Sequence, residues 1–66
     1  MRITLNGEVR EVASALTVEA LLRTFDLDPK KVAVERNLEI VRRSEFSRLK
    51  IEDGDRLEIV HFIGGG

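Results

Sequence analysis

The sequence contains no cysteine, and this absence limits both how the chain is stabilised and what chemistry it can perform. Disulfide bonds and cysteine-based zinc sites are excluded, and sulfur cannot be carried on a side-chain thiol. The 66 residues must therefore form one small domain by packing alone. A domain of this size buries only about 60% of its extended surface, so its core has to be economical.

Excess charge of one sign and long apolar runs are also missing. The formal net charge is -1, and basic residues are interleaved with acidic ones, which argues against a nucleic-acid-binding surface. Without a long apolar run or a signal-peptide start, we expect no membrane span and a cytoplasmic location. The composition, 42% apolar and 35% charged, is typical of a soluble globular domain.

Metal-binding groups are equally scarce. His61 is the only histidine, and with no cysteine to share a metal we expect it to be a strand residue and the chain to bind no metal. The acidic trio Glu52, Asp53 and Asp55 lacks the spaced ligands of a calcium loop. We therefore interpret this stretch as a solvated polar turn centred on Gly54.

The N-terminal residues predict a β-hairpin. Residues 1–6 alternate, with Ile3 and Leu5 on one face, and residues 8–12 form the return strand. Between them, Asn6-Gly7 is a dipeptide that a tight type I′ turn favours, because both central residues need positive φ.

A short amphipathic helix is predicted next. Thr17 is a suitable N-cap, and Asp28-Pro29 is expected to end the helix, because the residue before a proline avoids the α region. Apolar residues recur between them with the spacing of one helical face: Val18, Leu21, Leu22 and Phe25. A helix of about two to three turns is unstable alone in water, so it must pack on a sheet.

The second half of the sequence predicts another hairpin. Residues 31–35 and 40–41 have strand patterns and are expected to pair across a turn. Leu38 occupies a turn position where glycine would be more comfortable, so we expect Asn37 to take any left-handed conformation that the turn requires.

The predicted order of elements indicates one fold class. Residues 44–49 are irregular, with Phe46 and Leu49 expected to point inward, and residues 56–63 form the last strand. This order fits an α+β fold, the ubiquitin-like β-grasp, in which one main helix packs across a mixed sheet of four or five strands. The first and last strands are expected to pair in parallel at its centre.

Three consecutive glycines, Gly64, Gly65 and Gly66, follow the last strand. Glycines have no side chains to pack, so we expect a β-grasp domain over residues 1–63 and a flexible tail over residues 64–66. A free carboxylate on Gly66, with a pKa of about 3.5, is an unreactive anion that must first be activated, for example as an acyl-adenylate. Such a tail suits entry into another protein's narrow active site; a frayed terminus or cloning scar is the alternative.

Three stretches give the chain a family resemblance: VERNxEIV at residues 34–41, DGD at residues 53–55 and IVHFxGGG at residues 59–66, where x marks a position that does not contribute. With them, essentially the whole chain resembles the sulfur carrier proteins of thiamine biosynthesis, the ThiS family of ubiquitin-like proteins. Two residues depart from that pattern, Leu38 and Arg42, where such relatives often have a glycine and a proline.

The resemblance implies a carrier whose catalysis belongs to partner enzymes. A ubiquitin-activating-like adenylyltransferase would use ATP and magnesium to adenylate Gly66. A cysteine desulfurase or other persulfide donor would then convert the adenylate to a thiocarboxylate, and thiazole synthase would receive the sulfur. Gly64 and Gly65 would pass through the narrow channel that leads to the active site of the partner enzyme. The chain itself would be no enzyme, would bind no cofactor, nucleic acid or membrane, and would be monomeric when free.

The last strand also carries a predicted docking patch. Alternation places Leu57, Ile59 and His61 on the core face and turns Val60 and Phe62 outward. An exposed valine and phenylalanine beside a reactive tail fit a docking surface for the activating enzyme. In the alternative interpretation, Phe62 folds back onto its own domain.

Other functions remain open at this point. The small subunit of molybdopterin synthase uses the same tail chemistry and fold, although that family is usually longer and tends to carry prolines before its glycines. A ubiquitin-like protein modifier, or an interaction module with an inert tail, is also compatible with these residues.

Overall fold

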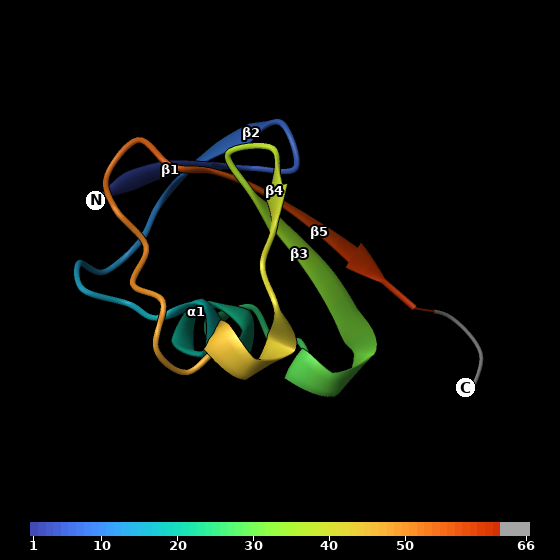
Figure 1. The fold of residues 1–66 in the computed structure, drawn as a ribbon. Coiled ribbons are helices and arrows are strands. Elements are labelled where there is room, and N and C mark those ends of the chain that lie inside the picture. Colours follow the sequence, from blue (N-terminus) through green and yellow to red (C-terminus); the bar gives the residue numbers. More distant parts are fainter. Residues whose placement is uncertain (63–66) are drawn as a thin grey trace.

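A computed structural model describes residues 1–62, which form one α-helix packed across a five-stranded mixed sheet (Figure 1). The strand order is β2-β1-β5-β3-β4, and the central pair, β1 and β5, is parallel while the other neighbours are antiparallel. This is the predicted ubiquitin-like β-grasp. The predicted tail, and with it the domain boundary at residue 63, lies outside the described residues. The strands are β1 (Arg2–Leu5), β2 (Glu8–Glu11), β3 (Val32–Arg36), β4 (Glu39–Ile40) and β5 (Arg56–His61).

The first hairpin forms as predicted. Leu5 pairs with Glu8 across a two-residue turn, in which Asn6 has φ 49° and Gly7 has φ 83°. Both values are positive, as a type I′ turn requires, and asparagine and glycine tolerate them best. Ile3 and Leu5 are buried on the inner face of the sheet.

The helix α1 (Val18–Thr24) begins where the sequence predicts. The Thr17 hydroxyl oxygen accepts a hydrogen bond of 3.1 Å from the Ala20 backbone N–H. The first free N–H groups of the helix, on Val18 and Glu19, donate to the carbonyl oxygens of Leu49 and Phe46 at 2.9 Å. The start of α1 is thus tied to the irregular segment before β5, and its unpaired donors are satisfied.

The predicted end of the helix at Asp28-Pro29 is wrong by one turn. Phe25 is the C-cap and the following residue, Asp26, has φ 61°, which stops the helix earlier. Pro29 instead opens a short 3-10 helix, η1 (Pro29–Lys31), where its missing N–H costs nothing. Asp28 caps η1 by accepting a hydrogen bond of 2.9 Å from the Lys30 N–H.

The second hairpin corrects the interpretation of its turn. Arg36 pairs with Glu39, so only Asn37 and Leu38 lie in the turn, with φ 51° and φ 73°. We expected Asn37 to supply the left-handed conformation, but a two-residue turn of this type requires it at both positions. Leu38 therefore adopts a backbone conformation that glycine would adopt without strain, with its side chain 80% exposed.

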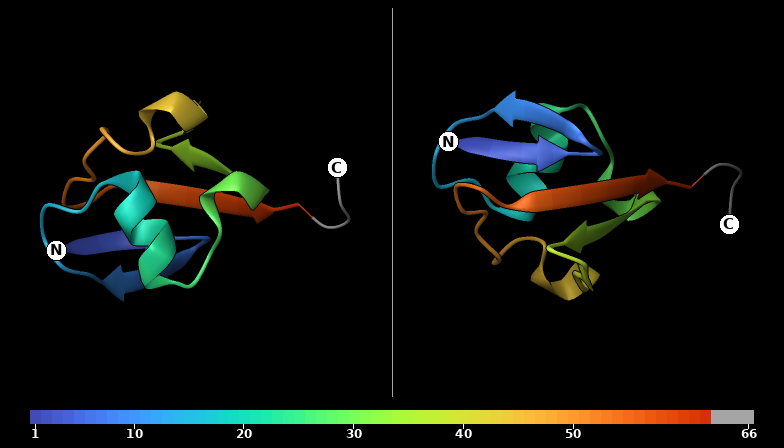
Figure 2. Two further views of the ribbon diagram at one scale, coloured as in Figure 1. Left: turned by 90° about the horizontal axis from the view of Figure 1, so that it is seen from below. Right: turned by 90° about the horizontal axis from the view of Figure 1, so that it is seen from above.

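One core lies between α1 and the inner face of the sheet (Figure 2). The predicted helix face packs there, with Phe25 and Ile59 only partly buried at its margin. The segment around η2 (Arg43–Glu45) closes the core, because Phe46 is buried and Leu49 partly buried, as predicted. The buried residues of the core are Ile3, Leu5, Val18, Leu21, Leu22, Val32, Val34, Phe46, Ile51 and Leu57. Within residues 1–62, no helix has the length and apolar character needed to span a membrane.

Candidate functional site

The predicted reactive residue Gly66 and the threading residues Gly64 and Gly65 lie outside the described residues. The described part of the candidate site is therefore β5, which leads directly to them, together with the surfaces beside it. Figure 2 shows β5 running through the middle of the sheet and projecting past β1 at its C-terminal end. The two ends of this strand have different surroundings.

The start of β5 is bound on both sides. On one side, Thr4 N–H donates to the Asp55 carbonyl at 3.0 Å, and Asn6 N–H donates to the Leu57 carbonyl at 2.9 Å. On the other side, Asn37 N–H donates to the Arg56 carbonyl at 2.8 Å, and the Asn37 side-chain oxygen accepts from Arg56 N–H at 2.9 Å. Since Leu57 is fully buried, this end of the strand belongs to the core.

The turn before β5 is not the solvated turn that we expected, because Asp55 is buried. One of its carboxylate oxygens, Oδ2, accepts from Arg36 Nε at 2.7 Å and from Glu52 N–H at 2.8 Å, and the other accepts from Asn37 Nδ2 at 3.1 Å. Glu52 and Asp53 do remain exposed. The carboxylate thus joins the 52–55 turn to the β3–β4 turn.

The pKa of Asp55 reflects these partners. Burial by itself raises the pKa of this carboxyl group, because it removes water from the charged form. The hydrogen bonds from Glu52 N–H, Arg36 and Asn37, and the positive charge of Arg36, act in the opposite direction and prevail, so the pKa lies below its usual value. Asp55 is therefore charged at neutral pH and serves the fold, without the features of a catalytic acid.

The end of β5 is exposed. Val60 is 61% exposed and Phe62 is 52% exposed, so both side chains point outward as predicted and Phe62 does not fold back into the core. The backbone remains ordered by β3: Val60 lies opposite Ala33, and Phe62 N–H donates to the Lys31 carbonyl at 2.8 Å. The role of this pair in docking stays a prediction.

His61 departs from the expectation that it shares the core face. It is exposed, although alternation places it on the same side as the buried Leu57. The reason is that the core ends near Ile59, which is itself only partly buried. The His61 side chain makes no ion pair among residues 1–62.

The outer face of the sheet contains a feature that the sequence alone did not reveal. In the register of β4, β3 and β5, Glu35 lies opposite both Ile40 and Glu58. Opposite residues of antiparallel strands share a face, so two glutamates are neighbours in the middle of this surface, with exposed Val60 and Ile40 beside them. Like charges placed opposite each other are unfavourable in the free protein. Finding this pair requires the strand register, which the sequence pattern does not provide.

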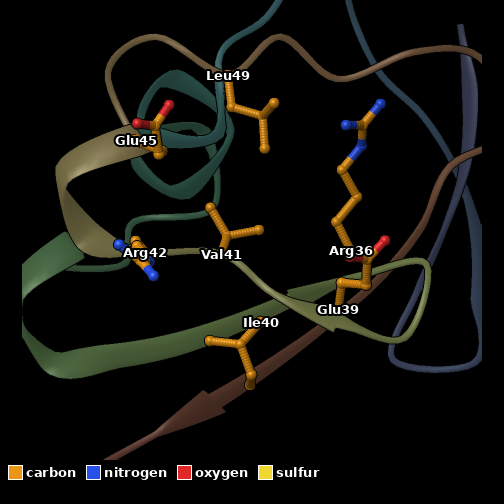
Figure 3. A pocket seen from close by; sticks show the side chains of 7 residues that line it. All are labelled: Arg36, Glu39, Ile40, Val41, Arg42, Glu45 and Leu49. Atoms are coloured by element: carbon orange, nitrogen blue, oxygen red, sulfur yellow. The ribbon is translucent and has the colours of Figure 1, made fainter.

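A shallow pocket lies between β4 and η2 (Figure 3). Val41 and Leu49 form its apolar centre, and Arg36 extends along one side. That arginine already binds Asp55 and lies 3.6 Å from Glu52. The other lining residues are Glu39, Ile40, Arg42 and Glu45. The residues that line the pocket include no Ser, Thr, Cys, Lys, His or Tyr. The described residues hold no group of three or more His, Cys, Asp or Glu side chains arranged for a metal.

Comparisons with known proteins identify relatives over the whole chain. The ThiS family model matches residues 3–66. A thiazole synthase of Paramagnetospirillum magneticum is 54% identical over 66 residues, which is 100% of this chain but only 20% of that protein. The sulfur carrier protein ThiS of Bacillus subtilis is 40% identical over 65 residues, covering 97% of this chain and 98% of that one.

A solved structure has the same fold. The crystal structure of the thiamine biosynthesis protein ThiS from Geobacter metallireducens superposes with a TM-score of 0.84 at 36% sequence identity, and each chain is covered completely. The fold, the family model and the full-length relative therefore agree: the chain belongs to the ThiS family.

Proposed function

We propose that this chain is a sulfur carrier for thiamine biosynthesis and that Gly66 carries the sulfur. The observation that supports this most strongly is the ThiS family match, which extends through the three glycines to residue 66. A relative of the same length, from Bacillus subtilis, is named as a sulfur carrier. Relatives named thiazole synthase contain a homologous segment of about a fifth of their length, which favours thiazole synthase as the acceptor.

The chemistry proceeds in three steps. The Gly66 carboxylate attacks ATP with magnesium in an adenylyltransferase, which releases pyrophosphate and forms an acyl-adenylate. In the second step a persulfide, supplied by a cysteine desulfurase or another donor, displaces AMP and forms an acyl disulfide on Gly66. A thiol then attacks the sulfur atom that came from the persulfide's carrier, so that the S–S bond breaks, the thiocarboxylate leaves on Gly66, and the thiol and the carrier sulfur form a disulfide. Thiazole synthase then takes the sulfur, and the carrier returns to its carboxylate form. The carrier is a co-substrate in this cycle, and the catalytic groups belong to its partners.

The residues of the chain fit this role. Glycine has no Cβ, so neither a channel wall nor an incoming nucleophile meets a side chain at positions 64 to 66. No cysteine offers a second place for sulfur. Val60 and Phe62, which precede these glycines in the sequence, have exposed apolar side chains that are suited to dock against the rim of the active site.

The alternatives are less well supported. Family membership favours the thiamine pathway over a small subunit of molybdopterin synthase, and the sequence before the glycines, His61-Phe62-Ile63, contains no proline. A protein modifier would attach Gly66 to lysine amines, a reaction with a different mass signature.

Intact-mass spectrometry tests the proposal. The protein is incubated with ATP, magnesium, the adenylyltransferase and a persulfide donor, and its mass is compared before and after. We expect a gain equal to the exchange of one oxygen for one sulfur, and we expect it to depend on ATP. The starting mass also establishes that the carboxylate tested belongs to Gly66.

A variant lacking Gly65 and Gly66 is the matched control and should show no gain. An unchanged mass for the full chain, with an adenylyltransferase shown to be active on another carrier, would contradict sulfur carriage. A gain equal to a coupled protein, with loss of water, would identify a modifier instead.

A further inference from the structure

The outer face of the sheet, which α1 does not cover, collects the exposed apolar side chains of this domain. The strand register and the alternation along each strand place four of them there, and each is more than half exposed: Val9, Ile40, Val60 and Phe62. In the described part of the chain, the remaining large apolar side chain that is this exposed, Leu38, lies in the turn between β3 and β4. Figure 2, right, shows the sheet from this side with α1 behind it. Apolar groups gathered on one face indicate a surface that binds a partner.

Two glutamates interrupt this apolar face. Glu35 on β3 lies directly opposite Glu58 on β5, and Ile40 lies opposite Glu35 on its other side. Opposite residues have Cβ atoms about 4.5–5.5 Å apart, so two negative charges are neighbours among apolar groups. Neither carboxylate forms an ion pair within residues 1–62, and Arg56, two residues before Glu58 on the same face, forms none either. The free carrier thus contains an unfavourable charge pair that a cation from another molecule would relieve.

We propose that this outer face binds the adenylyltransferase, and that a lysine or arginine of the enzyme, flanked by apolar side chains, is placed between Glu35 and Glu58. This inference rests on the proposed function. The enzyme must bring an anionic tail carboxylate to the negatively charged phosphates of ATP, so the entrance to its active site needs positive charge to hold both. Gly66 follows Glu58 by eight residues, which limits their distance to about 29 Å. An enzyme that holds Gly66 therefore reaches the two glutamates with the surface around its active site.

Two other occupants fit this face less well. If two copies of the chain stacked their outer faces about a two-fold axis at this point, the glutamates of one copy would meet those of the other. Four carboxylates would then be buried together without a cation, which is unfavourable. Thiazole synthase receives a tail that is already activated, so its active site does not have to hold that tail beside ATP. Charge complementarity therefore favours the adenylyltransferase.

Binding isotherms of the full chain with the adenylyltransferase test this proposal. The double variant Glu35→Gln/Glu58→Gln should bind at least tenfold more weakly, because the enzyme's cation would lose both of its partners. The matched control, Glu8→Gln/Glu19→Gln, removes the same amount of charge from β2 and α1, away from this face. It should bind within about twofold of the wild type. Added salt should weaken binding of the wild type more than binding of the double variant, because salt screens charge pairs.

Melting curves of the free variants separate docking from a structural role. Since the two like charges face each other, the double glutamine variant should melt at or above the wild-type temperature. Glu58→Lys supplies from the chain itself the cation that we assign to the enzyme. Its lysine pairs with Glu35, so this variant should melt higher than the wild type and yet bind more weakly than Glu58→Gln, because it repels the enzyme's cation. A marked fall in the melting temperature of the double glutamine variant would assign the pair to the fold and overturn the docking role.

Other binding results would also overturn the proposal. Binding of the double glutamine variant at wild-type strength excludes the acidic pair from the interface, and equal weakening in the control variant shows an effect of overall charge alone. Weaker binding to thiazole synthase, with normal binding to the adenylyltransferase, identifies the other enzyme as the occupant. Self-association of the wild type that the double glutamine variant alters identifies a second copy.

The sulfur reaction distinguishes this inference from the proposed function. At an enzyme concentration that saturates the double glutamine variant, this variant should gain the same mass as the wild type, because its Gly66 is unchanged. If the wild type gains sulfur but the double variant binds normally, the proposed function stands and the docking inference fails. If the variants bind as expected but the wild type gains no sulfur, the docking inference stands and the proposed function fails.

Discussion

The two ends of β5 make an instructive contrast. At its start, Leu57 is fully buried, both edges of the strand are paired, and Asp55 and Asn37 add side-chain hydrogen bonds. At its end, only β3 remains as a neighbour among the described residues, and Val60 and Phe62 are more than half exposed. Within six residues, the strand passes from the interior of the domain to its surface.

This contrast separates stability from the proposed function along one strand. A domain of 66 residues has a small core. Each apolar residue that is exposed to bind a partner is therefore one fewer residue that stabilises this core. Placing them at the far end of a strand that is fixed at its start limits that loss. We therefore expect substitutions at the start of β5 to change stability, and substitutions near its end to change partner reactions.

The largest effect is expected from deleting Gly65 and Gly66. Adenylation should be abolished, because the reactive carboxylate would no longer reach the ATP site, while thermal unfolding should hardly change, because glycine has no side chain to pack. Pyrophosphate release and a melting curve measure the two effects. A marked fall in melting temperature would show that the glycines stabilise the folded domain. It would then be wrong to separate the start of β5, as the part that stabilises the fold, from the part of the chain that serves partners.

The next largest effect is expected from Leu57→Ala at the start of the strand. The side chain is fully buried, and truncating a buried leucine costs about 2–5 kcal/mol of unfolding free energy. Val60→Ala, three residues further on, is the matched control and should cost less than about 1 kcal/mol. Denaturant unfolding of both variants gives the comparison, and equal costs would show that the two ends of β5 are equally packed.

Asp55→Asn should have a smaller effect that depends on pH. Replacing the carboxylate weakens its bonds to Arg36 and Glu52 N–H and places an amide donor near Asn37, at a cost of about 1–3 kcal/mol at neutral pH. The pKa of Asp55 is lower in the folded than in the unfolded protein. Its stabilising contribution is therefore present above the unfolded pKa of about 3.9 and is lost as pH falls through the folded value.

Unfolding free energies from pH 7 down to pH 3 test this sign. The stability difference between wild type and Asp55→Asn should narrow as the solution becomes more acidic. A difference that stays constant, or that widens in acid, would show that the charge of Asp55 does not stabilise the fold.

Phe62→Asp is expected to give the smallest change in free energy and acts on binding alone. Since the phenylalanine is half exposed, the melting temperature should be nearly unchanged. Binding to the adenylyltransferase should weaken by more than about 1 kcal/mol, because an aspartate at an apolar contact must lose its water. Binding isotherms for wild type, Phe62→Asp and the apolar control Phe62→Leu check this. Normal binding by the aspartate variant would exclude the end of β5 from the docking surface.

Local sequence patterns were sufficient for most of the fold. Alternation and Asn6-Gly7 predicted the first hairpin, and the Thr17 cap with its apolar spacing predicted the start of the helix. Both signals lie within a few residues of one another and act through local backbone geometry. The end of the helix was misplaced because Asp26, a residue with no strong stop signal, adopts a left-handed conformation there.

Contacts between distant residues could not be predicted in this way. The burial of Asp55 depends on Arg36, which is 19 residues away in the sequence, and an acidic turn ordinarily faces water. The Glu35–Glu58 neighbours and the Asn6–Ile59 hydrogen bonds likewise depend on strand register. For the proposed reactive residue, Gly66, the family resemblance was more informative than any local pattern, because a glycine has no side chain that could signal chemistry.

The most direct test of the account is to locate the transferred sulfur. After reaction with ATP, the adenylyltransferase and a persulfide donor, the protein is fragmented in a tandem mass spectrometer. The account predicts that every fragment containing Gly66 carries the exchange of one oxygen for one sulfur and that fragments ending before Gly66 carry none. Sulfur found on any other residue, or an unmodified Gly66 under conditions in which a known carrier reacts, would contradict it.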